Sequence, residues 1–185
     1  MKKDAQLYKD TKGILIRHEE IVNAVRKLGE MITEDYAGKE PVLVCVLKGA
    51  CIFYADLIRE IDLHVTMDFV IASSYGSGTQ STGNVKIRKD LDFDIAGRDV
   101  IVVEDIVDSG VTLSFLKRIL ADRGAASIKI ATLLDKPARR KTDLKADYFC
   151  FTVPNEFVVG YGLDYNERYR NLPDICILKP EIYNQ

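Results

Sequence analysis

Apolar residues follow two periodicities along the chain, one typical of helices and the other of strands. Between residues 18 and 36 they stand three or four positions apart, at Ile21, Val25, Leu28 and Ile32. This spacing predicts a helix with one buried face, which ends near Gly38. The run Val42–Leu47 that follows is continuously apolar and rich in valine, as expected of a strand buried on both faces of a sheet.

The rest of the chain repeats this alternation of strand and helix patterns. We expect further strands over residues 64–72, 99–103, 127–134, 148–151 and 175–178, and further helices over residues 51–61 and 112–123. Strands that alternate with helices form βαβ units, so the predicted fold is α/β, with a central, mainly parallel sheet flanked by helices. Ligands bind such sheets beyond the carboxyl ends of the strands. The loops expected there span residues 48–50, 104–112, 136–137 and 157–164.

The composition narrows the classes of partner. The 185 residues are 47% hydrophobic, enough for one domain with a full core, and the formal net charge is only −2. We therefore expect neither nucleic acid nor a membrane surface as a partner. No apolar run reaches the ~18 residues of a membrane span, and the four cysteines lack the spacing of a metal site. These features predict a cytoplasmic protein whose cysteines are mostly buried, reduced thiols.

The strongest chemical signal follows the strand predicted over residues 99–103. Two adjacent carboxylates, Glu104 and Asp105, end this strand, and Asp108 opens a turn of small residues that leads into the next helix. The glycine in this turn lets an anion approach the free N–H groups of the helix start, and two hydroxyl side chains add donors. The turn therefore suits a phosphate monoester, and the carboxylates suit sugar hydroxyls and Mg²⁺.

The alternative interpretation is that Asp108 or Ser109 simply caps the helix. Capping accounts for one residue of this kind, but not for three carboxylates at the end of one strand. Charged side chains are rarely buried together without compensation. We therefore interpret the segment as a binding site.

The segment Val102–Thr112 resembles the phosphoribosyl-diphosphate (PRPP) signature of the type I phosphoribosyltransferases. Within that family the chain is most similar to the bacterial hypoxanthine (hypoxanthine-guanine) phosphoribosyltransferases, from about residue 14 to about residue 178. The other motifs that carry the resemblance are Leu47–Gly49, Ser74–Tyr75, Leu134–Pro137 and Phe157–Glu167. The resemblance implies a single domain of residues 1–185, with a small hood built from about residues 1–16 and 155–185.

The resemblance also implies a reaction. A purine-salvage enzyme of this kind moves the 5-phosphoribosyl group from PRPP to N9 of a 6-oxopurine, and yields IMP or GMP and pyrophosphate, with Mg²⁺ as cofactor. Glu104 and Asp105 would bind the ribose hydroxyls near Mg²⁺, and Asp108 would act as general base toward N7 of the purine. The 5′-phosphate would lie on Asp108, Ser109, Gly110, Val111 and Thr112.

The remaining ligand contacts are implied in the same way. Pyrophosphate would be bound by Leu47, Lys48, Gly49, Ser74, Tyr75 and Arg170, and a non-proline cis peptide is common at Leu47–Lys48 in the family. The purine would contact Lys136, Phe157, Val158 and Asp164. An aromatic ring suits a flat base, and a donor-only ammonium favours a 6-oxo over a 6-amino group. Asp164 would also help to hold a second Mg²⁺, so the implied metal-binding residues are Glu104, Asp105 and Asp164.

Two segments have two interpretations each. Residues 74–84 include eight Gly, Ser or Thr among eleven, which suits a disordered hairpin tip or, as the resemblance implies, a lid over bound substrate. Residues 136–145 hold five basic residues, which we interpret as a solvated or interface stretch and not as an RNA site. The alternating Asp90, Asp92 and Asp94 lack the glycine and glutamate of an EF-hand loop.

The main rival function is a non-catalytic regulator on the same fold. Such a protein has no need of a general base, so the presence of Asp108 argues against it. An NTPase would need G-x-x-x-x-G-K-[ST], and a dinucleotide oxidoreductase would need G-x-G-x-x-G after a strand; neither motif occurs. The resemblance implies a homodimer or homotetramer, and leaves open the preference among hypoxanthine, guanine and xanthine.

Overall fold

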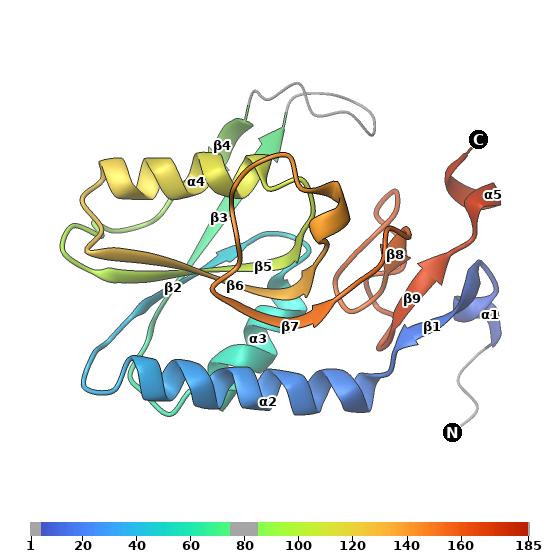
Figure 1. Cartoon of the computed structure of the whole chain (residues 1–185), viewed down its shortest axis with the longest axis horizontal. Coiled ribbons are helices and arrows are strands. Elements are labelled where there is room, and N and C mark those ends of the chain that lie inside the picture. Colours follow the sequence, from blue (N-terminus) through green and yellow to red (C-terminus); the bar gives the residue numbers. More distant parts are fainter. Residues whose placement is uncertain (1–4, 75–84, 185) are drawn as a thin grey trace.

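The computed structural model describes residues 5–74 and 85–184 of the chain, which form two sheets (Figure 1). The larger sheet has the strand order β4-β3-β2-β5-β6-β7, and all its pairs are parallel except β3 with β4. Its strands are β2 (Val42–Val46), β3 (Thr66–Ser74), β4 (Val85–Lys89), β5 (Asp99–Val107), β6 (Ser127–Asp135) and β7 (Tyr148–Thr152). The predicted α/β fold with a central, mainly parallel sheet is confirmed.

Helices cover both faces of this sheet, because its central strands are apolar on both sides. In Figure 1, α4 lies on one face and α2 with α3 on the other. Residues Leu43 and Ile101 join the core beneath α2 and α3, whereas their neighbours Val44 and Val102 join the core beneath α4. The helices are α2 (His18–Asp35), α3 (Cys51–Leu57) and α4 (Val111–Asp122), with the 3-10 turns η1 (Ile58–Glu60) and η2 (Pro137–Arg139).

A second, antiparallel sheet with the order β1-β9-β8 joins the two ends of the described chain. In Figure 1 it lies beside the end of the large sheet where β5 and β6 finish. The sequence pattern predicted β9, but neither β1 nor β8, which has only two residues. Its strands are β1 (Thr11–Ile16), β8 (Val158–Val159) and β9 (Ile175–Leu178), with the short helices α1 (Ala5–Tyr8) and α5 (Pro180–Tyr183) beside them.

Most predicted boundaries hold to within two residues, and two differ by more. The expected strand end at Val103 is wrong, because β5 pairs with β6 as far as Val107, opposite Asp135. This pairing keeps the acidic residues inside the strand although the apolar run stops before them. The helix expected over residues 51–61 ends at Leu57 and continues as a 3-10 turn.

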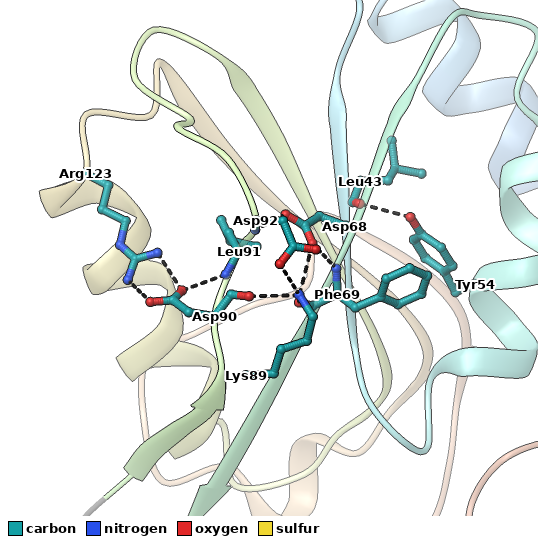
Figure 2. A network of polar contacts seen from close by, with 9 residues as sticks. All are labelled: Leu43, Tyr54, Asp68, Phe69, Lys89, Asp90, Leu91, Asp92 and Arg123. Carbon is teal, nitrogen blue, oxygen red and sulfur yellow. Dashed lines mark hydrogen bonds and ion pairs between the residues drawn. The ribbon is translucent and has the colours of Figure 1, made fainter.

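A polar network ties the edge strand β4 and its neighbour β3 to the end of α4 (Figure 2). The carboxylate of Asp68 is buried and accepts hydrogen bonds from two backbone amides, while Lys89 Nζ lies 3.4 Å from its Oδ1 and 3.1 Å from Asp92 Oδ1. Arg123 donates two hydrogen bonds of 2.6 Å to Asp90. Two of the alternating aspartates, Asp90 and Asp92, therefore pair with cationic side chains, whereas Asp94 accepts a hydrogen bond from the amide of Ala96.

None of the helices formed by residues 5–74 and 85–184 combines the length and the apolar character needed to cross a bilayer. Within the same residues no two of the four cysteines form a disulfide bond. Cys45 and Cys176 are buried as expected, whereas Cys150 is half-buried and Cys51 is exposed.

Candidate active site

The acidic pair lies between two neighbouring cavities at the carboxyl end of β5. Glu104 lines a cavity of about 360 Å³, and Asp105 lines a second one of about 220 Å³. Consecutive side chains of a strand point to opposite sides, so one pair of adjacent carboxylates can serve both cavities. Ile106 and Asp108 line both cavities and mark where they adjoin. The acidic groups, which were expected to converge on one pocket, are thus divided between two adjoining cavities.

Both carboxylates of the pair are electrostatically unfavourable as charged groups in the protein alone. Burial, and then the charge of Asp105, raises the pKa of Glu104 well above its usual range. Burial also raises the pKa of Asp105, although a hydrogen bond with Glu104 opposes this rise. Glu104 Oε2 is buried and has no hydrogen-bond partner within the described residues. The pair therefore favours a bound proton or a cation beside it.

The turn after β5 presents free backbone N–H groups to the larger cavity. The first amides of a helix have no intrahelical acceptor. Gly110, which precedes α4 with φ +80°, has no side chain that could cap them. The amide of Val111 makes only a long bond of 3.4 Å to Ser109 Oγ. The turn residues that line this cavity are Asp108, Ser109, Gly110 and Thr112. Simple capping does not describe this turn, and the arrangement suits a bound anion.

The loop after β2 approaches the acidic pair from the neighbouring strand. The peptide bond between Leu47 and Lys48 is cis, as the family resemblance predicted. A Cβ atom on Gly49 would lie 1.6 Å from Asp105 Oδ2, and a Cβ atom on Gly162 would lie 2.1 Å from the carbonyl oxygen of Gly49. Glycine is required at both positions because the backbone packs directly against its neighbours there. Leu47 and Gly49 both line the larger cavity.

Of the other residues predicted to contact pyrophosphate, Ser74 is the last residue of β3. Tyr75 and the rest of the predicted lid, residues 76–84, lie outside the described residues. Lys48 Nζ lies 3.1 Å from Glu167 Oε1 at the protein surface. Arg170 contacts the same glutamate, forms an ion pair of 2.9 Å with Asp164 Oδ1 and donates a 2.8 Å hydrogen bond to the carbonyl oxygen of Gly162. Both predicted cationic residues are thus paired with carboxylates.

The smaller cavity lies between the two sheets. Asp105 and Lys136 line it from the large sheet, and Phe157, Val158 and Asp164 line it from the segment around β8. The four residues predicted to bind a purine are therefore together, although they come from chain segments that are far apart in sequence. Ile106, Asp108, Arg139 and Leu163 complete the lining.

Lys136 occupies this cavity as a largely buried cation. Its side chain is only 5% exposed, and burial lowers its pKa. Its ammonium donates a 2.6 Å hydrogen bond to the carbonyl oxygen of Glu156. An ammonium has three donors, so this bond leaves donors for a ligand.

Several site residues were not predicted from the sequence. Arg139 Nε lies 3.2 Å from Asp108 Oδ1, an oxygen that is buried and has no hydrogen bond among the described residues. Arg140 is mostly buried and pairs with Asp135, so of the two interpretations of residues 136–145, a solvated or an interface stretch, the solvated one does not hold at this residue. Ile106, a partly buried apolar residue near the end of β5, gave no chemical signal. The basic residues did give a chemical signal, but the direction in which their side chains point depends on the fold of the loop.

The predicted metal-binding residues do not form a closed cage. Within residues 5–74 and 85–184, no three His, Cys, Asp or Glu side chains are arranged to hold a metal ion by themselves. Asp164 raises the pKa of Asp105 through its charge, so the two carboxylates are near enough to interact. Mg²⁺ often binds through one or two carboxylates and substrate phosphates, which this arrangement suits.

The chain is similar to known proteins over most of its length. Residues 13–166 match the phosphoribosyl transferase domain family. A hypoxanthine-guanine phosphoribosyltransferase of Streptococcus thermophilus is 58% identical over 179 residues, which cover 97% of this chain and 99% of that protein.

Two solved structures are similar over nearly the whole chain. A hypoxanthine phosphoribosyltransferase of Staphylococcus aureus has a TM-score of 0.95 and 48% identity, with 100% of both chains covered. A hypoxanthine phosphoribosyl transferase of Trypanosoma cruzi, studied for the role of its C-terminal region in oligomeric state and activity, has a TM-score of 0.90 and 40% identity, with 96% of each chain covered. The chain therefore belongs to the phosphoribosyltransferase family and, within it, to the hypoxanthine-guanine phosphoribosyltransferases.

Proposed function

We propose that this chain transfers the 5-phosphoribosyl group from PRPP to N9 of hypoxanthine or guanine, and produces IMP or GMP and pyrophosphate for purine salvage. One observation carries the proposal. A cavity lined by carboxylates and free amides adjoins a second cavity lined by Lys136 and Phe157, and Asp108 lines both. A phosphorylated sugar and a flat base can therefore meet beside one carboxylate.

In this proposal the larger cavity binds the phosphoribosyl group. The amides and hydroxyls of residues 108–112 hold the 5′-phosphate, since a helix start favours an anion. Glu104 in this cavity, and Asp105 at the place where the smaller cavity adjoins it, accept hydrogen bonds from the ribose hydroxyls. Their position also suits the positive charge that develops on the ribose as the bond to pyrophosphate breaks.

The smaller cavity binds the purine. Phe157 stacks on the base, and Lys136 donates to its 6-oxygen. Val158 and Asp164 lie along the edge of the base through their backbone groups. A 6-amino group would bring its own donors toward the Lys136 ammonium, so adenine is disfavoured.

Asp108 accepts the proton that the purine loses. The N9–C1′ bond forms as the bond from C1′ to pyrophosphate breaks, and the proton leaves the purine at N7. Asp108 Oδ1 is buried without a hydrogen bond among the described residues, which leaves it able to accept that proton. Arg139, whose Nε lies 3.2 Å from the same oxygen, must share or release it when the base binds.

The pyrophosphate contacts in this proposal come from three segments of the chain. The loop of Leu47, Lys48 and Gly49 offers backbone groups and one cation, Arg170 offers a second cation, and Ser74 and Tyr75 are assigned to the same group from the family resemblance. Glu167 holds both cations in the protein alone. These exposed pairs are weak, so a diphosphate can displace the glutamate.

Glu104, Asp105 and Asp164 are the residues that fit Mg²⁺. The unpartnered Oε2 of Glu104 and the raised pKa of the acidic pair both favour a cation at this place. Mg²⁺, when bound, neutralises charge on pyrophosphate as it departs. The protein residues need only orient the substrate and exclude water around it.

We also infer the wider setting of the reaction. The second sheet, from the two ends of the chain, supplies the hood over the purine cavity of a single domain. PRPP is a highly charged metabolite, so the enzyme is expected in the cytoplasm, where such compounds are made. Exposed apolar side chains on α2 and β7, namely Val22, Met31 and Phe149, support a homodimer or homotetramer, which sedimentation velocity would test.

The direct test incubates the purified chain with PRPP, Mg²⁺ and one of four bases. IMP and GMP should form from hypoxanthine and guanine, adenine should react far more slowly, and EDTA should stop the reaction. The rate with xanthine, compared with the rates for hypoxanthine and guanine, measures the preference among these bases that the site leaves open. Tight nucleotide binding without any nucleotide formation would support a regulator and refute the proposal.

A further inference from the structure

The ring of Phe157 is enclosed by other aromatic rings on the sides away from the purine cavity. Its centroid lies 4.8 Å from that of Tyr183, with an interplanar angle of 22°, and 5.6 Å from that of Tyr165, at 89°. Phe157 lines the smaller cavity, whereas neither tyrosine does. Tyr183 thus stacks on one face of the ring and leaves the cavity side available.

Backbone hydrogen bonds between segments far apart in the sequence hold Tyr183 in this position. Tyr183 is the last residue of α5, which directly follows β9 (Figure 1). The amide of Leu178 in β9 donates to the carbonyl oxygen of Phe157 at 2.8 Å. The amide of Lys179 donates to the carbonyl oxygen of Asp10 at 2.9 Å. The backbone of Phe157 is therefore hydrogen-bonded to β9, the strand that leads into the helix that carries Tyr183.

We propose that Tyr183 is a positioning residue that sets the ring plane of Phe157 and thereby determines how strongly the enzyme binds the purine. A phenylalanine at the mouth of a cavity can turn about χ1 and χ2, and each turn away from the base loses stacking area. Tyr183 on one face and Tyr165 on the edge restrict both rotations. Phe157 is then oriented before the base arrives, and binding costs less side-chain entropy.

This inference rests on the proposed function, because it assigns Phe157 to the base. It predicts a selective effect. Tyr183→Ala should raise the KM for hypoxanthine by about 2- to 10-fold, the range expected for one aromatic stacking contact. The KM for PRPP should not change, because the phosphoribosyl cavity lies on the other side of Ile106. The kcat should change little, because Asp108 is untouched.

Three further variants separate ring stacking from general packing. Tyr183→Phe keeps the ring and should keep the wild-type KM for hypoxanthine. Tyr183→Leu keeps apolar volume without a ring and should behave like Tyr183→Ala. Ile182→Ala is the matched control, since it removes apolar volume from the same helix and the same hydrophobic cluster.

Calorimetry gives a readout that a purely structural role would not move. Tyr183→Ala should weaken GMP binding and leave the binding of ribose 5-phosphate, which has no base, unchanged. Thermal melting and sedimentation velocity are measured on every variant to compare folding and assembly. The inference is overturned if Tyr183→Leu retains the wild-type KM, or if ribose 5-phosphate and GMP binding weaken equally. A wild-type protein that makes no IMP would instead refute the proposed function.

Discussion

Replacement of Glu104 by glutamine would test the charge of the buried acidic pair. The pKa of Glu104 is raised above its ordinary value of 4.5 by burial and by Asp105, and its Oε2 has no hydrogen-bond partner among the described residues. A carboxyl group whose pKa is higher in the folded protein takes up a proton on folding. The stability of the wild type therefore falls as the pH rises from 4.5 through the pKa of the folded state. Glutamine has nearly the same shape and no titrating proton, so the variant avoids this loss.

The expected magnitude follows from the number of protons involved. The hydrogen bond between Glu104 and Asp105 opposes the rise in the pKa of Asp105, as expected if the two carboxyls share one proton. One proton changes the free energy of unfolding by at most about 1.4 kcal/mol per pH unit. The Glu104→Gln variant should thus become more stable than the wild type as the pH rises. The difference between their free energies of unfolding should grow by no more than about 1.4 kcal/mol per pH unit. The difference should close as the pH falls toward 4.5.

The assay is urea unfolding followed by circular dichroism at a series of pH values above 4.5, in EDTA and without substrate. Glu34→Gln, at an exposed glutamate of α2, is the control and should give a curve parallel to the wild type. The stabilised Glu104→Gln should also lose about 10- to 100-fold in kcat/KM for PRPP, because a hydrogen bond to a charged acceptor is lost. A constant difference in stability across the pH range would show that Glu104 does not titrate with a raised pKa.

Four other substitutions test separate parts of the structure. Asp108→Asn should lower kcat by about 10²-fold with little change in the KM for PRPP; an unchanged kcat would exclude Asp108 as the general base. Lys136→Ala should relax the discrimination against adenine in competition assays, and equal strictness would show that the 6-position is recognised elsewhere. Lys89→Met should reduce the free energy of unfolding by about 1–3 kcal/mol, because buried Asp68 loses its cation but keeps two amide donors. Arg123→Ala, which breaks a more exposed pair, should cost less than about 1 kcal/mol, and equal losses in urea unfolding would contradict this account.

The sequence by itself determined the class of the fold and the chemistry of the main motif. The continuous apolar run Val42–Leu47 requires cover on both faces of the sheet, and the spacing of apolar residues in α2 requires one buried helix face. Both requirements are local consequences of the hydrophobic effect and of backbone period, so pattern alone was sufficient. The three acidic residues beside Gly110 likewise indicated an anion and sugar site before any contact was known.

Only the tertiary structure decided how these groups are divided between two cavities. Pairing with β6 extended β5 through Glu104 and Asp105, and so directed the two carboxylates to different spaces, which the end of the apolar run did not reveal. The directions of Arg139 and Arg140 and the stacking of Tyr183 on Phe157 depend on contacts between segments far apart in sequence. Such contacts leave no periodic signal, because they are set by the packing of whole elements and not by the order of neighbouring residues.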